Sequence, residues 1–239
     1  HLHNASYKQR YLRNLLPADA LHMHINEDQT LSARRIASET GDIAVSITDC
    51  YKKQTFSFDE KCKTLGIVSP TYSWGLPVIV TEFLQRLNLS HKPDYIFFIA
   101  TYGTTPGQTG RFADNILAPK GLPLSAKFSV KMPDTWTPIF DLSNKEKVRR
   151  INDNAELEVD SIIKQIKNFT AGDFMKNKLP YPLAKIGYNI EYDSMRKTKH
   201  FSVGDTCVGC GLCVKNCPVS ADRSNKKRSL LHRSGRWIL

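Results

Sequence analysis

The sequence predicts a doubly wound α/β domain with a parallel sheet, followed by a small cysteine-rich domain. Strand-like and helix-like segments alternate along most of the 239 residues. Several strand-like segments are apolar throughout, which is typical of strands covered on both faces by helices. Four of the six cysteines lie in one short run near the C-terminus. With 41% hydrophobic and 24% charged residues, the composition is that of a globular protein and excludes wholesale disorder.

Hydrophobic periodicity places the first elements of the α/β domain. Residues 21–25 alternate with period two, which suits a half-exposed strand. A helix is expected over residues 30–40, because apolar residues recur at helical spacing and Gly41 follows where a helix should end. Strands follow at residues 43–48 and 64–69, and the second of these is continuously apolar.

The remaining elements continue the same alternation. A helix is expected over residues 77–87, with a proline in its first turn. An apolar strand at 95–101 precedes a helix over 108–117, and residues 128–132 alternate as a further strand. The longest helix is expected over 144–169, where apolar residues step by three or four positions throughout. Together these segments predict the doubly wound parallel sheet.

The cysteine run has the spacing C-x2-C-x2-C-x3-C and is followed by a proline. Bacterial ferredoxins bind a 4Fe-4S cluster with this spacing. Gly209 and Gly211 suit the tight backbone turns that such a run needs, because glycine adopts left-handed conformations readily. A zinc site is the alternative, but structural zinc sites usually pair two C-x2-C knuckles, and the sequence has no second knuckle. The predicted metal ligands are Cys207, Cys210, Cys213 and Cys217.

The other two cysteines, Cys50 and Cys62, stand alone in the sequence. They are expected to be small buried apolar residues or surface thiols.

Two loops after neighbouring predicted strands form a candidate ligand site. In a doubly wound sheet, ligands bind beyond the carboxyl ends of the strands. The loops 69–77 and 101–107 both combine aromatic, hydroxyl and glycine residues, which suits a flat ring that stacks on side chains while backbone amides approach its polar edge. One such loop is equally well explained as a lid on the core, but two consecutive loops favour a ligand. The candidate residues are Pro70, Thr71, Tyr72, Trp74, Gly75, Thr101, Tyr102 and Gly103.

With these motifs, residues 30–221 resemble the flavodoxin/ferredoxin fusion proteins of anaerobic bacteria, in which a flavodoxin-like domain precedes a two-cluster 4Fe-4S ferredoxin domain. The resemblance rests on residues 68–77, 100–107 and 131–134 and on the cysteine run. It implies a flavodoxin-like sheet with a small C-terminal ferredoxin-like iron–sulfur domain. It also implies FMN held by the two loops, 4Fe-4S clusters, and electron transfer between them.

Both ends depart from the family pattern. Such a domain opens with a phosphate loop resembling S-x-T-G-N-T, which holds the FMN phosphate at a helix N-terminus. Here only Thr30 matches that loop, so it is the one candidate contact for the phosphate, and Glu27 and Asp28 would repel it. No second cysteine run follows the first. We hypothesise that residues 1–29 and those beyond Ala221 come from a different reading frame or a recombined gene.

The predicted organisation has five parts. They are an atypical N-terminal segment (1–29), a flavodoxin-like domain (30–170), a connector (171–200), a partial 4Fe-4S ferredoxin-type domain (201–221) and a basic tail (222–239). Much of the net charge of +11 sits at the two ends, which argues against nucleic acid as the main partner. No apolar run is long enough to cross a membrane, and no hydrophobic signal core begins the sequence, so we expect a cytoplasmic protein.

The first function hypothesis is electron transport through a 4Fe-4S centre and FMN to a redox partner protein or a small-molecule electron acceptor. A degenerate or frameshifted family member without cofactor is the second. A binder of nucleic acid or an anionic surface through the basic tail is the third. The sequence contains no Ser/His/Asp order, P-loop or other motif for side-chain catalysis, so any oxidoreductase activity would belong to the cofactors.

Overall fold

The computed structural model describes residues 20–24, 27–59, 61–134, 140–195, 206 and 208–211. Within these ranges, the side chains of residues 20–24, 27–32 and 193–195 are outside the description.

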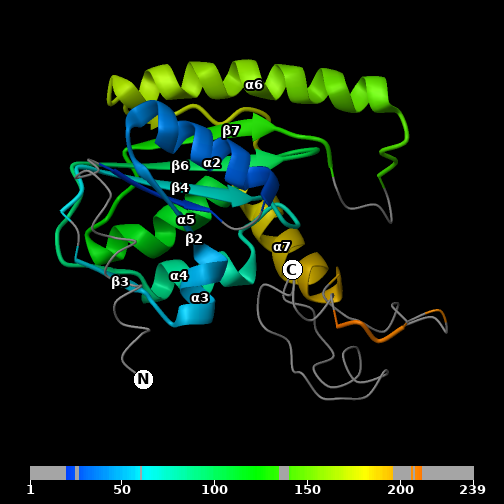
Figure 1. Cartoon of the computed structure of the whole chain (residues 1–239). Coiled ribbons are helices and arrows are strands. Elements are labelled where there is room, and N and C mark those ends of the chain that lie inside the picture. The colour runs from blue at the N-terminus through cyan, green and yellow to red at the C-terminus, as the bar shows by residue number, and fades with distance from the viewer. Residues whose placement is uncertain are drawn as a thin grey trace.

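Six parallel strands form the main sheet in the order β2-β1-β4-β6-β7-β8 (Figure 1). Two short strands, β3 and β5, pair separately. With these two set aside, the first five strands of the sheet follow the order 2-1-3-4-5, which is the flavodoxin-like order. The predicted flavodoxin-like parallel sheet is therefore confirmed. The strands are β1 (Ala20–His24), β2 (Ile43–Ser46), β3 (Ser57–Phe58), β4 (Thr64–Pro70), β5 (Asn88–Leu89), β6 (Tyr95–Tyr102), β7 (Ala126–Lys131) and β8 (Gly172–Asp173).

Helices cover both faces of the sheet (Figure 1), with α2 and α6 on one face and α3, α4 and α5 on the other. Every residue of β4 and β6 is buried, as their continuous apolar sequences predict. Along β6, Ile96 and Phe98 pack with α3, α4 and α5, whereas Phe97 and Ile99 pack with α2 and α6. The helices are α2 (Glu27–Thr40), α3 (Ile47–Lys53), α4 (Val78–Arg86), α5 (Thr109–Leu117), the 3₁₀ turn η1 (Ala118–Lys120), α6 (Lys145–Lys167) and α7 (Tyr181–Met195).

The strand expected at residues 43–48 is shorter than predicted. It ends at Ser46, whose side-chain oxygen accepts a hydrogen bond from the backbone N–H of Asp49 at 3.3 Å. Serine is a favoured N-cap because its side chain satisfies a free backbone donor of the first helical turn. The cap starts α3, a helix that the sequence analysis did not predict.

The strand expected at residues 21–25 is confirmed as an inner strand of the sheet. Its expected half-exposure concerns side chains outside the description. As β1, it lies between β2 and β4, with Leu21 aligned to Ile43 on one side and to Leu65 on the other. The segment 1–29, expected to be atypical, thus supplies an inner strand of the sheet, next to the edge strand β2. It also supplies the start of α2, which begins three residues earlier than the expected helix over 30–40.

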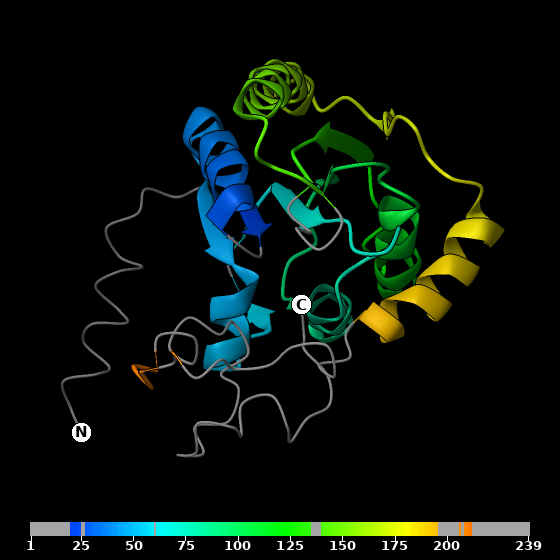
Figure 2. The same cartoon turned by 90° about the vertical axis from the view of Figure 1, so that its right-hand side faces the viewer.

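The segment expected to be a connector, 171–200, contains two regular elements. Its first residues form β8, which extends the sheet beside β7. Its second half forms α7, which lies beside α5 (Figure 2). The rings of Tyr181 and Tyr188 both contact Phe112 of α5, with centroids 5.7 Å and 5.6 Å away. Tyrosines seven positions apart share one helix face, and that face packs on the domain.

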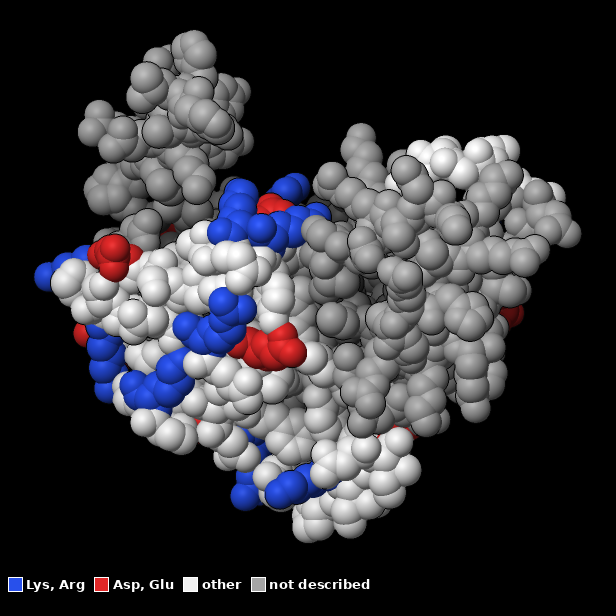
Figure 3. All heavy atoms as spheres, turned by 90° about the horizontal axis from the view of Figure 1, so that it is seen from below, with Lys and Arg blue, Asp and Glu red and all other residues white. Residues whose placement is uncertain are grey.

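Basic side chains are dispersed over the face of the molecule that carries α3 and α4. Figure 3 shows Lys and Arg there in several separate groups, with acidic side chains beside some of them. The described part of this face therefore shows no single continuous basic surface. The basic tail, 222–239, lies outside the described residues.

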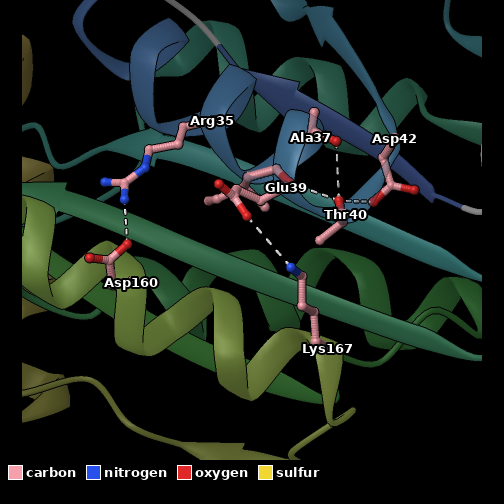
Figure 4. A network of polar contacts seen from close by, with 8 residues as sticks. Arg35, Ala37, Glu39, Thr40, Asp42, Asp160 and Lys167 are labelled. Atoms are coloured by element: carbon pink, nitrogen blue, oxygen red, sulfur yellow. Dashed lines mark hydrogen bonds and ion pairs between the residues drawn. The ribbon is translucent and has the colours of Figure 1, made fainter.

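Ion pairs join α2 to α6 above the sheet (Figure 4). The Arg35 guanidinium contacts the carboxylates of Glu156 and Asp160, which are one turn apart on α6. Near the other end of both helices, Lys167 Nζ lies 3.6 Å from the Glu39 carboxylate. Exposed pairs of this kind contribute only about 0–1 kcal/mol each, so their main effect is to fix how α2 lies on α6.

A membrane-crossing helix would need a long apolar stretch. None of the helices in the described ranges has both the length and the apolar character to span a bilayer.

Candidate functional site

Part of the predicted cluster-binding run is described. Cys210 is a free, exposed thiol, whereas Cys207, Cys213 and Cys217 lie outside the described residues. The glycines on either side of Cys210 both have left-handed backbones, with φ of 68° at Gly209 and 72° at Gly211. These two turns are the ones expected of a run that folds its thiolates around an iron–sulfur cube. The described residues of the run therefore fit a 4Fe-4S cluster.

The two isolated cysteines are unsuitable as ligands. Cys50 and Cys62 are only 5% and 7% exposed, and both lie in the hydrophobic core between the sheet and helices α3, α4 and α5. Burial raises the pKa of the Cys50 thiol to about 11, so it stays protonated at neutral pH, whereas iron requires the thiolate. Of the two alternatives expected for these cysteines, buried apolar residues or surface thiols, the structure shows the first. The described ranges hold no group of three or more His, Cys, Asp or Glu side chains arranged for a metal ion.

The first candidate loop is built around a tight turn after β4. Tyr72 and Gly75 exchange two backbone hydrogen bonds of 3.0 Å each. The two residues between them, Ser73 and Trp74, have left-handed φ angles of 46° and 67°. A turn with two such residues normally carries Asn-Gly, and a non-glycine residue there costs roughly 1–3 kcal/mol. The turn therefore holds Trp74 in a conformation that its own backbone disfavours, as is common at ligand-binding sites.

Backbone hydrogen bonds join the two candidate loops. The Thr71 N–H donates to the Thr101 carbonyl at 2.9 Å, and the Gln108 N–H donates to the Trp74 carbonyl at 3.0 Å. The close approach depends on Gly107, where a Cβ atom would lie 2.1 Å from the Trp74 carbonyl oxygen. The expectation that both loops meet at the carboxyl edge of the sheet is confirmed.

The candidate residues differ in accessibility. Pro70, Thr101 and Tyr102 are buried, and burial raises the pKa of the Tyr102 phenol. Gly103 is partly exposed and packs against Asp134, since a Cβ at position 103 would lie 2.3 Å from a carboxylate oxygen.

One polar atom in the first loop is unsatisfied. The Thr71 Oγ1 is buried and has no hydrogen-bond partner among the described residues. Buried hydroxyls almost always have a partner, so an unpaired one at a candidate site needs an explanation. The polar edge of a ring bound between the loops would supply the missing partner. The residues of the two loops therefore fit the ring of a flavin.

Helix α7 holds the first loop in place, which the sequence analysis missed. The Tyr188 hydroxyl donates to the Leu76 carbonyl at 2.6 Å, and the Val78 N–H donates to the Tyr192 hydroxyl at 3.0 Å, so Tyr192 caps the start of α4. The Trp74 ring packs directly on Gly187, where a Cβ would lie 2.1 Å from it. The spacing of Tyr181, Ala184, Tyr188 and Tyr192 is the signal that would have predicted this helix.

The phosphate end of the site does not fit FMN. Thr30, the predicted phosphate contact, lies inside the first turn of α2 and not in a loop before it. Glu27 and Asp28 begin the same helix, and their charges oppose a phosphate at its N-terminus. The chain has no glycine there to bring backbone N–H groups close. The Thr30 side chain is outside the described residues.

Comparison with known proteins supports the cluster-binding region. A family model described as a 4Fe-4S binding domain matches residues 204–222. Curated proteins give no match to the chain.

Several solved structures are similar at low identity. A rubredoxin oxygen:oxidoreductase from the anaerobe Desulfovibrio gigas is 14% identical, with a TM-score of 0.39 over 71% of this chain and 42% of that one. The flavodiiron core from Synechocystis is 14% identical, with a TM-score of 0.40 over 68% of this chain and 40% of that one. An archaeal flavodoxin is 13% identical, with a TM-score of 0.36 over 61% of this chain and 98% of its own. The chain thus spans about two fifths of the length of the first two structures. The strand order of the sheet and the family match at the cysteine run together show a flavodoxin-like domain joined to a 4Fe-4S binding domain.

Proposed function

We propose that this protein transfers electrons through one 4Fe-4S cluster bound by Cys207, Cys210, Cys213 and Cys217. The observation that carries the proposal is the cysteine run itself, which matches a 4Fe-4S binding domain over residues 204–222. The two left-handed glycines beside Cys210 support it. A cluster of this type carries single electrons, and the acceptor is a redox partner protein or a small molecule. The proposal places the protein in the cytoplasm, where cysteines remain reduced.

Metal analysis after anaerobic reconstitution tests the cluster. The wild-type chain is expected to hold about four iron and four sulfide per molecule. Cys210→Ser should lose most of the iron, because the exposed thiol is a proposed ligand. Cys62→Ser is the matched control and should keep the iron, because Cys62 lies in the core. Zinc in place of iron, or equal iron in both variants, would contradict the proposal.

Cys217→Ser tests whether one run supplies all four ligands. In two-cluster ferredoxins, the fourth cysteine of a run binds the other cluster, but this sequence has no second run. If all four cysteines bind one cluster, this variant should lose iron as Cys210→Ser does. Unchanged iron in Cys217→Ser would show that the fourth ligand comes from elsewhere.

We also infer that the loops at residues 70–75 and 101–103 bind a flavin by its ring. The unpaired buried Oγ1 of Thr71 and the strained backbone of Trp74 support this inference. A bound flavin would supply a carrier of one or two electrons beside the one-electron cluster. Trp74 would stack on one face of the ring, and Thr71 would hydrogen-bond to its polar edge.

Because the phosphate end does not fit, the site should bind riboflavin about as well as FMN. We expect the two dissociation constants, measured by quenching of flavin fluorescence, to agree within about threefold. The double variant Glu27→Gln/Asp28→Asn should strengthen FMN binding by up to about threefold and leave riboflavin unchanged, since it removes charges that repel only the phosphate. Glu146→Gln, in the first turn of α6, is the matched control and should alter neither constant.

The flavin experiment has two contrary outcomes. FMN binding much tighter than riboflavin in the wild-type chain would show that the phosphate end does hold a phosphate. Binding of neither flavin would refute the ring site and leave the cluster proposal standing.

A further inference from the structure

Two pairs of neighbouring residues interlock between the first candidate loop and helix α7. The indole ring of Trp74 occupies the space beside Gly187, where a Cβ atom would lie 2.1 Å from Cζ3 and 2.4 Å from Cε3. In return, the ring of Tyr188 occupies the space beside Gly75, where a Cβ atom would lie 2.3 Å from Cδ2. Each segment thus contributes one aromatic ring and one glycine, and each ring fills the place of a side chain at the other glycine. We call these four residues the ring–glycine interlock.

The glycine at position 187 is not required by its own backbone. Gly187 lies in the middle of α7, and its φ is outside the left-handed region. Glycine is unfavourable inside a helix, and alanine would be the better helix former. The contact with the Trp74 ring therefore accounts for a glycine at this position, because any side chain there would overlap the ring.

Trp74 is the residue through which α7 acts on both candidate loops. Its carbonyl oxygen accepts the hydrogen bond of 3.0 Å from the Gln108 N–H, which joins the loops. Its φ of 67° is disfavoured, and such a conformation persists only where surrounding contacts hold it. Helix α7 supplies those contacts through the Tyr188 hydroxyl, which donates to the Leu76 carbonyl at 2.6 Å, and through the space at Gly187.

The packing on α7 leaves part of Trp74 accessible. Trp74 is only partly buried, whereas Leu76, two positions further along the loop, is 1% exposed. An aromatic side chain that is already held in place can stack on a flat ligand without first being ordered, which lowers the entropic cost of binding. The interlock therefore suits Trp74 to its proposed contact with a ring.

We propose that Gly187 is a positioning residue for the flavin-ring site. It leaves the space in which α7 holds the Trp74 indole, and a side chain at position 187 would push the indole out of that space. This inference rests on the proposed binding of a flavin ring by the loops at residues 70–75 and 101–103. Loss of one stacking partner should weaken binding of the ring about tenfold.

Titration of riboflavin into the full chain, followed by quenching of flavin fluorescence, tests the positioning role. Gly187→Ala should raise the riboflavin dissociation constant about tenfold. Asn189→Ala is the matched control, because Asn189 is an exposed residue of the same helix and alanine is the better helix former there too. The control should leave the dissociation constant unchanged. An unchanged constant in Gly187→Ala refutes the positioning role.

A second substitution distinguishes the position of the indole from general damage to the helix. Trp74→Phe removes the outer ring atoms Cζ3 and Cη2, which a Cβ at position 187 would meet. Alone it should weaken riboflavin binding about threefold, because the smaller ring keeps part of the stacking area. In that background, Gly187→Ala should cost no more than about a further twofold. A tenfold loss in both backgrounds would refute the proposal.

The indole itself reports the contact with Gly187 without any flavin. In the variant Trp136→Phe/Trp237→Phe, Trp74 is the only tryptophan left in the chain. Adding Gly187→Ala should move the emission maximum to longer wavelength and increase quenching by acrylamide, because the displaced indole gains contact with water. Iron measured in the same samples should be unchanged, since none of the proposed cluster ligands is altered.

The outcomes separate this inference from the proposed function. Unchanged indole emission in Gly187→Ala refutes the proposed displacement of Trp74. A shifted emission with an unchanged riboflavin constant refutes the positioning role and leaves the ring site standing. If the wild-type chain binds neither flavin, the proposed ring site is refuted and the positioning role with it, whatever the indole emission shows.

Discussion

Replacing Gly107 by alanine should uncouple the two candidate ligand loops. Its backbone has a φ of 55°, and a Cβ atom there would lie 2.1 Å from the Trp74 carbonyl oxygen and 2.5 Å from the Trp74 Cα. The left-handed backbone costs a non-glycine residue about 1–2 kcal/mol. Overlap with the neighbouring backbone adds about 1–3 kcal/mol, and loss of the Gln108 hydrogen bond to Trp74 adds about 1 kcal/mol. We therefore expect Gly107→Ala to lower the free energy of unfolding by about 3–6 kcal/mol.

Gly121→Ala is a matched control for the backbone part of this cost. Gly121 has a φ of 76°, but no atom lies within 4 Å of the position of its Cβ. The control should lower the free energy of unfolding by only about 1–2 kcal/mol. In urea unfolding followed by circular dichroism, the midpoint urea concentrations of the two variants should differ by about 1–2 M. The slope of the free energy of unfolding against urea concentration should be the same in both variants. Equal midpoints would refute the conclusion that the loops are held together by close contact at this glycine.

Three further predictions follow from individual side chains. Burial raises the pKa of Tyr95 from 10.0 to about 12, so Tyr95 contributes stability below pH 10 that should fall by roughly 3 kcal/mol as the pH rises to about 12. Tyrosinate absorbance and urea unfolding measure this fall, and Tyr95→Phe should reduce it, leaving the part that comes from Tyr102, whose pKa is also raised. Lys120 Nζ donates to three backbone carbonyls at the end of α4, so Lys120→Met should lower the free energy of thermal unfolding by about 1 kcal/mol, whereas Lys92→Met should leave it unchanged. In the protein without its cluster, iodoacetamide should modify Cys210 in the folded state and Cys50 only after unfolding; rapid labelling of Cys50 in the folded protein would contradict its burial.

The elements that the sequence predicted best are those whose apolar pattern runs along the whole strand or helix. Strands β4 and β6 are apolar along their whole length, and α6 repeats its apolar residues over six turns, so no distant partner is needed to recognise them. The end of β2 was misplaced because Ser46 is compatible with a strand, and its role as an N-cap depends on the turn that follows it.

The candidate site was predictable in part. The loops after β4 and β6 were identified because their residue types are unusual at strand ends, and the structure joins them by hydrogen bonds. Helix α7 was missed because prolines and basic residues around it indicated a connector, although its tyrosines have helical spacing. Its contacts with residues 74–78 link positions more than 100 residues apart, which no local pattern encodes.

By itself, the sequence determined the strands and helices with complete apolar patterns, the cysteine spacing and the glycines that permit its turns, because these depend on neighbouring residues and on backbone chemistry. Only the tertiary structure decided that β1 lies between β2 and β4 in the sheet, and that Trp74 packs against α7. These outcomes depend on packing between distant segments, where burial of apolar surface outweighs local preference.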